Sequence, residues 1–377
     1  MFVPDEWGPC DWVQAVTSGS RGQVRPRLAA LDGLRLVAAL AVMGFHYAGV
    51  RVPYWGVPSH VEFPTLSQVG RYGYLGVNLF FVISGFVILM TAYDRTIESF
   101  AASRVARLFP AYWVAVVLTS VLQQFWHAGR QPTPVESLLN LTMVQEAFDV
   151  VNVQGAFWTL WIELKFYLII GAFVLVGISR RRLIAFAVLW PLVGQVATAT
   201  DSGFLRPLSI PTYAPYFSAG VCLFLLHRER RELTTWLALA FDWVLCVHQA
   251  ANYAGRASRL TDSPVSPTVA AAVVTLSLVA VFACTTGPAG NVSWGWLTVA
   301  GALTYPLYLV HGQLGFFIID RLQPQLSSYV VLAVAAASSL LLAWLIHRMV
   351  ERPVASRLRR AVESSLRPAA DALTPPA

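Results

Sequence analysis

The sequence LDGLRLVAALAVMGFHY, residues 31–47, carries an arginine and a histidine in a stretch apolar enough to cross a bilayer. Arg35 and His46 are eleven residues apart, which is three helical turns plus roughly 20°, so both side chains lie on one helical face about 16 Å apart. Ionisable groups at this depth are costly in hydrocarbon and usually face a bundle interior or a wet cavity. His46 can take a proton near neutral pH. The alternative is a histidine that only ties two helices together by a hydrogen bond.

The composition indicates that most of the chain lies in a membrane. Of its 377 residues, 56% are hydrophobic and only 12% are charged, whereas soluble domains carry about a quarter charged residues. A bilayer core of about 30 Å requires roughly 20 apolar residues per helix. We therefore expect an all-α polytopic membrane protein with about ten transmembrane helices, near residues 31–50, 74–92, 110–127, 156–176, 183–200, 211–227, 235–252, 267–285, 295–318 and 328–349. Two of these spans are weak, because Pro191 interrupts one and Asp242 and His248 lie in another.

The distribution of arginines predicts the orientation in the membrane. With the N-terminus in the cytoplasm, the cytoplasmic segments hold eighteen arginines and the opposite side holds seven. Basic residues concentrate on the cytoplasmic side of membrane proteins, so we expect both termini in the cytoplasm. The net charge of +7 follows from this topology and requires no nucleic-acid partner.

Three segments are expected along the chain. Residues 1–28 are polar and lack the apolar core of a signal peptide, which predicts a cytoplasmic N-terminal segment. Residues 29–354 form the membrane domain, with an external loop at roughly 128–155. Residues 355–377 are basic and then rich in alanine and proline, so we expect a disordered cytoplasmic tail. The four cysteines are scattered and predict neither a disulfide framework nor a metal site.

Arg104 and Arg107 form an i, i+3 pair just before Pro110, where the third span is expected to begin. This spacing puts both guanidinium groups on one helical face, and their planar donors suit phosphate oxygens. Anchoring to lipid head groups is the alternative. Because Arg35 is expected at the same membrane level, three arginines around one cytoplasmic opening can hold a polyphosphate ligand.

Glu163 lies about 10 Å inside the fourth span, in the stretch FWTLWIELKFY of residues 157–167. A carboxylate at that depth must be paired or protonated. It can orient or polarise a histidine or an arginine in the bundle, or it can act as a structural polar clamp. Lys165, the only lysine, points about 200° away and is therefore not its natural partner.

A third group of polar residues follows one helical face near the end of the chain. Tyr305, Tyr308 and His311 advance in steps of three and form a stripe of two phenols and an imidazole. Tyrosines are often interfacial belt residues, but three polar groups on one face favour the lining of a cavity. Asn78 and Ser84 add two polar groups in the second span, and the glycines of that span permit close helix packing.

Six motifs occur in order between about residues 30 and 355: LDGLR at 31–35 with His46, GVNLFFVISGF at 76–86, RVARLFPAY at 104–112, WTLWIE at 158–163, YPLYLVH at 305–311 and VERP at 350–353. Together they resemble the acyltransferase-3 family, integral membrane enzymes that O-acylate sugars and related molecules. The resemblance implies a ten-span acyltransferase domain over residues 29–354 that uses acyl-CoA from the cytoplasm. Each motif alone is weak, but six in register are specific.

The resemblance also implies roles for individual residues. The family's arginine-x10-histidine motif falls on Arg35 and His46, its paired arginines on Arg104 and Arg107, and its glutamate on Glu163. We expect the arginines to bind acyl-CoA as a co-substrate, with no permanently bound cofactor or metal, and His46 to take the proton of the acceptor hydroxyl. Glu163 or Asp32 would orient the imidazole or balance its charge. The acceptor's path would be lined by Tyr305, Tyr308, His311, Asn78 and Ser84. Asn78 and Lys165 depart from the residues that the family often carries at these positions.

The acceptor is expected to be a hydroxyl-bearing sugar or glycoside, because family members acylate polysaccharides, lipid-linked sugars, peptidoglycan and sugar-bearing antibiotics such as macrolides. Basic residues that are almost all arginine, with abundant alanine, indicate a GC-rich bacterial genome and hence a bacterial inner membrane. A multi-span transporter or flippase for a sugar-containing or lipid-linked substrate is the alternative, since buried charges also mark substrate pathways. No internal repeat of the kind found in many transporters is visible.

Overall fold

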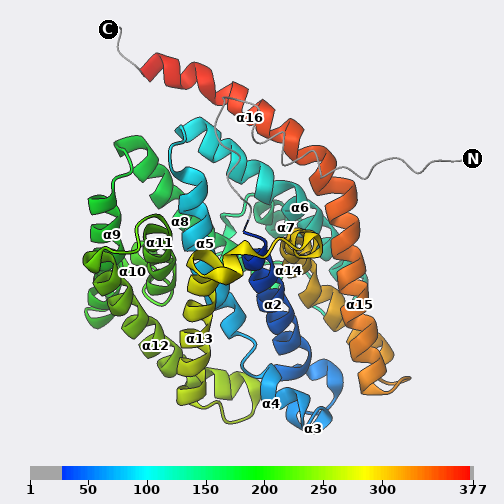
Figure 1. Cartoon of the computed structure of the whole chain (residues 1–377). Coiled ribbons are helices and arrows are strands. Elements are labelled where there is room, and N and C mark those ends of the chain that lie inside the picture. Colours follow the sequence, from blue (N-terminus) through cyan, green and yellow to red (C-terminus); the bar gives the residue numbers. More distant parts are fainter. Residues whose placement is uncertain (1–27, 374–377) are drawn as a thin grey trace, which may run out of the picture.

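The computed structural model describes residues 28–373, and every regular element in that range is a helix (Figure 1). The predictions for residues 1–27 lie outside the described residues. Long helices form a bundle, and short helical turns lie in the connections between them. The long helices are α2 (Ala29–Gly44), α5 (Leu75–Ala92), α6 (Ile97–Phe125), α8 (Trp158–Val176), α9 (Arg180–Ala199), α11 (Ala214–Arg228), α12 (Leu233–Thr261), α13 (Pro267–Thr286), α14 (Gly295–Leu322), α15 (Ser328–Ile346) and α16 (Arg352–Leu373). The short ones are η1 (Phe45–Gly49), η2 (Pro53–Trp55), α3 (Ser59–Glu62), α4 (Leu66–Gly70), α7 (Pro134–Asn140), η3 (Gln145–Phe148), η4 (Gly155–Phe157), α10 (Leu205–Ser209), η5 (Pro288–Asn291) and η6 (His347–Glu351).

Within residues 28–373, nine helical segments are long and apolar enough to cross a membrane. They include α9, which continues through Pro191, so the span near 183–200 is present. The span expected near 235–252 corresponds to α12, which is 29 residues long and packs against α11 and α13 but is more polar than the nine. The prediction of an all-α polytopic membrane protein is confirmed. The side on which each terminus lies remains a prediction.

The helices at the centre of the bundle approach each other closely at glycines. A Cβ atom on Gly85 would lie 2.2 Å from the carbonyl oxygen of Phe217, and one on Gly220 would lie 2.2 Å from that of Val82. These contacts join α5 to α11. On the other side of α5, a Cβ on Gly76 would lie 2.6 Å from the carbonyl oxygen of Ala38 in α2. Small residues therefore set the spacing of α2, α5 and α11, as expected where helix contacts cannot depend on the hydrophobic effect.

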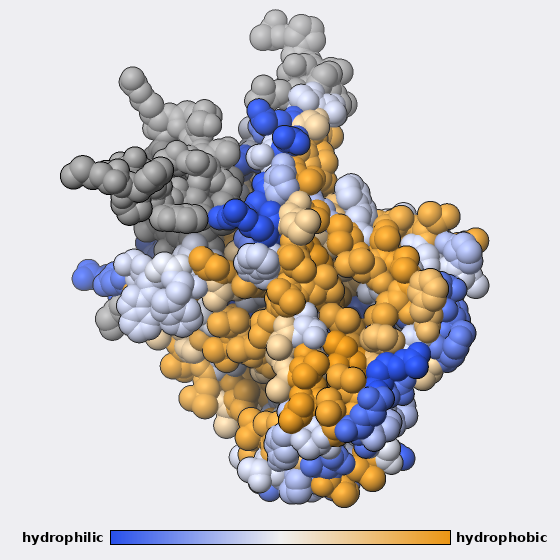
Figure 2. Space-filling model, turned by 90° about the vertical axis from the view of Figure 1, so that its right-hand side faces the viewer, coloured by the Kyte–Doolittle hydropathy of each residue, from blue (hydrophilic) through white to orange (hydrophobic). Residues whose placement is uncertain are grey.

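The outer surface agrees with a position in the bilayer. Figure 2 shows hydrophobic side chains over much of the face that α15 and its neighbours present, with hydrophilic side chains gathered above and below. Large apolar side chains are exposed on these helices, among them Val117, Leu118 and Val121 of α6 and Leu340, Leu341 and Trp344 of α15. In water such a surface would be an aggregation site, whereas in lipid it needs no cover.

The structure corrects two expectations about helix ends. The helix that contains Arg104 and Arg107 begins at Ile97, where the Thr96 side chain caps it, and continues through Pro110 rather than starting there. The tail expected to be disordered forms α16 as far as Leu373 and packs along α6 (Figure 1). It does so because its apolar residues recur at helical spacing and make one side of the helix hydrophobic despite its many arginines. Residues 374–377 lie outside the described part of the chain.

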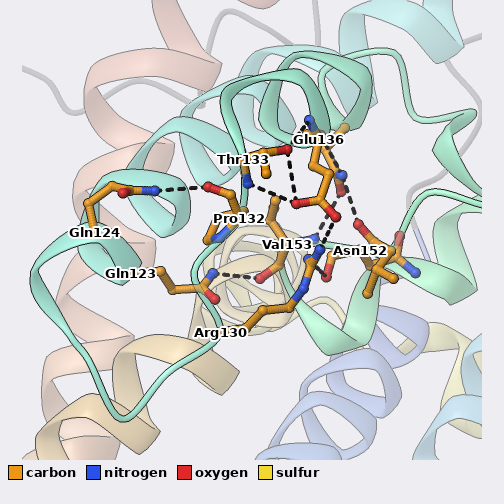
Figure 3. Close-up of polar contacts among 10 residues, drawn as sticks. Gln123, Gln124, Arg130, Pro132, Thr133, Glu136, Asn152 and Val153 are labelled. Carbon is orange, nitrogen blue, oxygen red and sulfur yellow. Dashed lines mark hydrogen bonds and ion pairs between the residues drawn. The ribbon is translucent and has the colours of Figure 1, made fainter.

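The loop between α6 and α8 is held by polar contacts (Figure 3). Thr133 and Glu136 form a capping box at the start of α7, in which each side chain accepts a hydrogen bond from the other residue's backbone N–H. Arg130 forms an ion pair with the Glu136 carboxylate. The Gln123 side-chain amide donates to the carbonyl of Val153 over 2.8 Å, which joins the end of α6 to the segment before α8. The expected external loop is therefore ordered.

Candidate active site

His46 lies in η1, a π-helical turn that continues α2. Such turns occur frequently at functional sites because they widen the helix locally and re-aim a side chain. The His46 Nδ1 atom is 2.9 Å from the carbonyl oxygen of Val42 and 3.1 Å from Nε2 of His311 in α14. Next to it, the Tyr47 hydroxyl donates a hydrogen bond of 2.6 Å to the carbonyl of His311. The end of α2 and the middle of α14 are thus tied together at two neighbouring residues.

The backbone carbonyls around the histidine pair determine which nitrogens carry protons. His311 Nδ1 faces the carbonyl oxygens of Leu307 at 3.1 Å and Tyr308 at 2.9 Å, so it is the N–H donor. In neutral His311 the Nε2 atom is then an acceptor. His46 Nδ1 faces that acceptor and the Val42 carbonyl, so it must also carry its proton. The remaining ring nitrogen, His46 Nε2, has no hydrogen-bond partner among residues 28–373, so its lone pair can act as a base.

His311 does not have the role that the sequence predicted, which was to line a cavity together with Tyr305 and Tyr308. Its side chain is only 1% exposed, and both of its ring nitrogens already have partners. It therefore has no free nitrogen for an acceptor and lies behind His46, whose side chain is partly exposed. This replaces the expected lining role with that of a hydrogen-bond partner for His46. The sequence did not show the contact because the two histidines are 265 positions apart.

A cavity of about 90 Å³ brings together most of the other predicted site residues. All three arginines, Glu163 and the two tyrosines lie on its wall, and five helices contribute to it. A larger depression on the α9 surface is lined mostly by apolar side chains. The lining residues of the polar cavity are Arg35, Val77, Phe80, Phe81, Ser84, Arg104, Arg107, Leu108, Thr159, Leu160, Glu163, Tyr167, Thr304, Tyr305 and Tyr308. Asn78 is buried in α5 but does not line this cavity.

The carboxylates expected to orient His46 lie elsewhere. The Glu163 carboxylate accepts hydrogen bonds from the hydroxyls of Tyr167 at 2.6 Å and Ser84 at 3.2 Å, so it belongs to the arginine-lined cavity. Asp32 is 3.9 Å from Arg35 and fourteen residues before His46, a rise of about 21 Å along the helix. Asp32 therefore cannot orient the imidazole, and the partner of His46 is His311.

The arginines are held in place but keep donors for a ligand. The Nη1 atom of Arg107 is 3.6 Å from the Glu351 carboxylate, and its guanidinium lies over the Tyr305 ring at 5.5 Å. The guanidinium of Arg104 lies over the Tyr167 ring at 5.7 Å. The ion pairs of Arg35 with Asp32 and of Arg107 with Glu351 are longer than ordinary hydrogen bonds. Within residues 28–373, the guanidinium groups of Arg35 and Arg107 donate no hydrogen bond.

Glu351 is a partner of Arg107 that the sequence did not single out. It is buried, and His347 Nδ1 lies 2.7 Å from its other carboxylate oxygen. The VERP motif contained it, but no role could be read from that motif alone. The available signal was a carboxylate at the end of an apolar span, which must find a cation.

Comparisons with known proteins identify the family of the chain. The sequence model of an acyltransferase domain matches residues 28–348. The peptidoglycan O-acetyltransferase OatA of Listeria monocytogenes is 27% identical over 172 residues, which cover 40% of this chain and 25% of that protein. The acyltransferase MdmB of Streptomyces mycarofaciens is 28% identical over 152 residues, or 38% of each chain. Protein 2 in the picA locus of Rhizobium radiobacter is 33% identical over 121 residues, 30% of this chain and 56% of that one. The chain thus spans between a quarter and about half of these relatives' lengths. No solved structure matches it.

Proposed function

Because the chain belongs to the acyltransferase-3 family of membrane O-acyltransferases, we propose that it moves an acyl group from acyl-CoA to a hydroxyl of a sugar-bearing acceptor. A relative named as a peptidoglycan O-acetyltransferase supports acetyl as the transferred group. The observation that carries the proposal is the arrangement on α2 and its extension. Arg35 faces the polar cavity at one end, and a histidine with a free Nε2 atom lies about 16 Å further along.

The arginines account for the donor. Arg35, Arg104 and Arg107 bind the phosphates of acyl-CoA, because charge-assisted hydrogen bonds to phosphate oxygens are stronger than the long ion pairs they replace. At about 90 Å³ the cavity is smaller than acyl-CoA, so we place the phosphates against the guanidinium groups and only the thin pantetheine arm inside. An extended arm covers most of the distance of about 16 Å to His46.

His46 supplies the base. As the acceptor oxygen attacks the thioester carbon, its proton passes to His46 Nε2. The tetrahedral intermediate then collapses, the C–S bond breaks, and the thiolate of CoA leaves with the proton from His46. The products are the ester and free CoA. His311 accepts the hydrogen bond from His46 Nδ1 throughout and stabilises the imidazolium, as the third member of a catalytic triad does.

The test uses the purified full chain in lipid nanodiscs with labelled acetyl-CoA. Replacing His46 by alanine or glutamine should lower acyl transfer, or the slower hydrolysis of the thioester by water, by about 10²- to 10⁴-fold. Binding of CoA should persist in both variants. The matched control is His127→Gln, which changes an exposed histidine in the loop after α6. Transfer at the wild-type rate in His46→Ala would refute the assignment, whereas accumulation of a sugar in vesicles without ester formation would favour a transporter.

A further inference from the structure

Aromatic side chains adjoin His46 on the side away from the arginines. The ring centroid of Phe316, in α14, is 6.2 Å from that of His46 in an edge-to-face arrangement. Tyr54, from the connection after η1, lies 5.6 Å from Phe316 and 5.0 Å from Trp126 at the end of α6. We call Tyr54, Trp126 and Phe316 the aromatic platform. Tyr54 and Phe316 are partly exposed, whereas Trp126 is fully buried beneath them.

A carboxylate stands beside this platform. Asp320 is four residues after Phe316 in α14, so both side chains lie on one helical face. The Trp126 indole N–H donates to Asp320 Oδ2 over 2.8 Å, and the Gln131 side-chain amide donates to the Trp126 carbonyl over 2.9 Å. Trp126 is therefore fixed by the ordered loop, and it fixes Asp320 in turn. Asp320 is partly exposed, and in the described part of the chain its Oδ1 atom accepts no hydrogen bond.

The platform and the arginine-lined cavity lie at opposite ends of the same helices. On each of these helices a cavity residue precedes His46 or a residue of the platform along the chain. Arg35 precedes His46 on α2 and its extension, Arg107 precedes Trp126 at the end of α6, and Tyr305 precedes Phe316 on α14. Phe316 follows Tyr305 by eleven residues, about 16 Å of helix, and Trp126 follows Arg107 by nineteen, about 28 Å. His46 lies between the two regions. A donor bound at the arginines and a second molecule bound at the platform would thus meet at His46 from opposite directions.

We propose that the aromatic platform and Asp320 bind a sugar ring of the acceptor and present one of its hydroxyls to His46 Nε2; this inference rests on the proposed function. The C–H face of a pyranose packs on aromatic rings, and its hydroxyls donate to a carboxylate, so this pair of features fits a neutral sugar. A lipid or acyl chain offers no hydrogen-bond donor, so it would bury the Asp320 charge with the Trp126 indole N–H as its one donor among the described residues. The Asp320 carboxylate would repel a phosphate, so the CoA end of the donor stays away from the aromatic platform.

The experiment separates binding of the sugar from the chemistry at His46. Release of CoA from labelled acetyl-CoA is measured without acceptor and with methyl β-D-glucopyranoside, an N-acetylglucosamine trimer or lactose. In the variants Phe316→Ala and Asp320→Asn, we expect the KM for the stimulating sugar to rise about ten- to a hundredfold. In the same variants the rate without acceptor should also be measured. The factor by which it falls should be at least ten times smaller than the factor by which the sugar-stimulated rate falls. Phe316→Tyr, which keeps the ring, should restore most of the stimulation.

Phe125→Ala and Asp149→Asn are the matched controls, because both residues are exposed near the same end of the molecule but outside the platform. They should respond to sugar as the wild type does. Two outcomes would overturn the proposed sugar site alone. One is an unchanged KM for sugar in Asp320→Asn. The other is a wild type that none of these sugars stimulates, although its hydrolysis of the thioester still depends on His46. Loss of His46 dependence in the acceptor-free reaction would instead contradict the proposed function.

Discussion

Replacing His311 tests whether His46 works with a partner or alone. His311→Leu keeps much of the buried volume but removes the acceptor 3.1 Å from His46 Nδ1, so that the Val42 carbonyl is its one remaining acceptor in the described part of the chain. The lost interaction is charge-assisted at the moment His46 carries the extra proton, and such bonds contribute about 1.5–3 kcal/mol. Because each 1.36 kcal/mol changes a rate tenfold, we expect kcat to fall roughly ten- to a hundredfold. His311→Gln, whose amide oxygen can still accept, should lose less.

The assay is steady-state transfer from labelled acetyl-CoA by each purified variant in nanodiscs, with kcat and KM determined separately. Thermal melting and CoA binding establish that the leucine variant is folded, which matters because residue 311 is almost fully buried. The effect should fall on kcat, since the His311 side chain contacts His46 and does not itself line the arginine-lined cavity. A folded His311→Leu protein with wild-type kcat would refute the reasoning about the histidine pair. A loss confined to the KM of the donor would place His311 in donor binding instead.

Three further predictions test the donor site, the packing and the loop. Replacing Arg104 and Arg107 together by alanine should raise the KM for acetyl-CoA at least about a hundredfold, with a smaller change in kcat, because two charged hydrogen-bond donors are lost. An unchanged donor affinity would mean that these arginines only orient the chain. Gly220→Ala should lower the free energy of unfolding by about 1–3 kcal/mol in thermal melts, because its Cβ would meet the Val82 carbonyl at 2.2 Å; Gly295→Ala, which meets nothing within 4 Å, is the control. The hydrogen bond from the Thr133 backbone lowers the pKa of Glu136 from its ordinary value of 4.5. The carboxylate therefore stabilises the loop above pH 4.5 and ceases to do so as the pH falls through the lowered pKa. At pH 5 pepsin should cleave residues 126–157 more slowly in the wild type than in Glu136→Gln, and the ratio of the two rates at equal pH should approach one as the pH falls; a ratio that does not change with pH would contradict this role.

The helical bundle and half of the site followed from local patterns in the sequence. Apolar stretches of the right length predicted the spans, and the sequence placed Arg35 and His46 in one continuous helical segment, which the structure has as α2 and its π-helical extension η1. Both predictions rest on helical periodicity, which is a local property. The expectation that Arg104 and Arg107 share an opening with Arg35 is consistent with the cavity they line together. By contrast, the start of α6 and the helical tail were misjudged. A proline inside a span and a basic amphipathic segment can both be helical when a neighbouring helix packs against them.

By itself, therefore, the sequence determined which residues are ionisable and which of them belong to helices long and apolar enough to cross a membrane. Only the tertiary structure decided which faces meet. It placed His311 rather than Glu163 or Asp32 against His46, and it gave Arg107 the Glu351 carboxylate as its partner. These contacts join residues 265 and 244 positions apart. They depend on helix packing set by glycines and by side-chain volume, which no pattern along one helix can reveal.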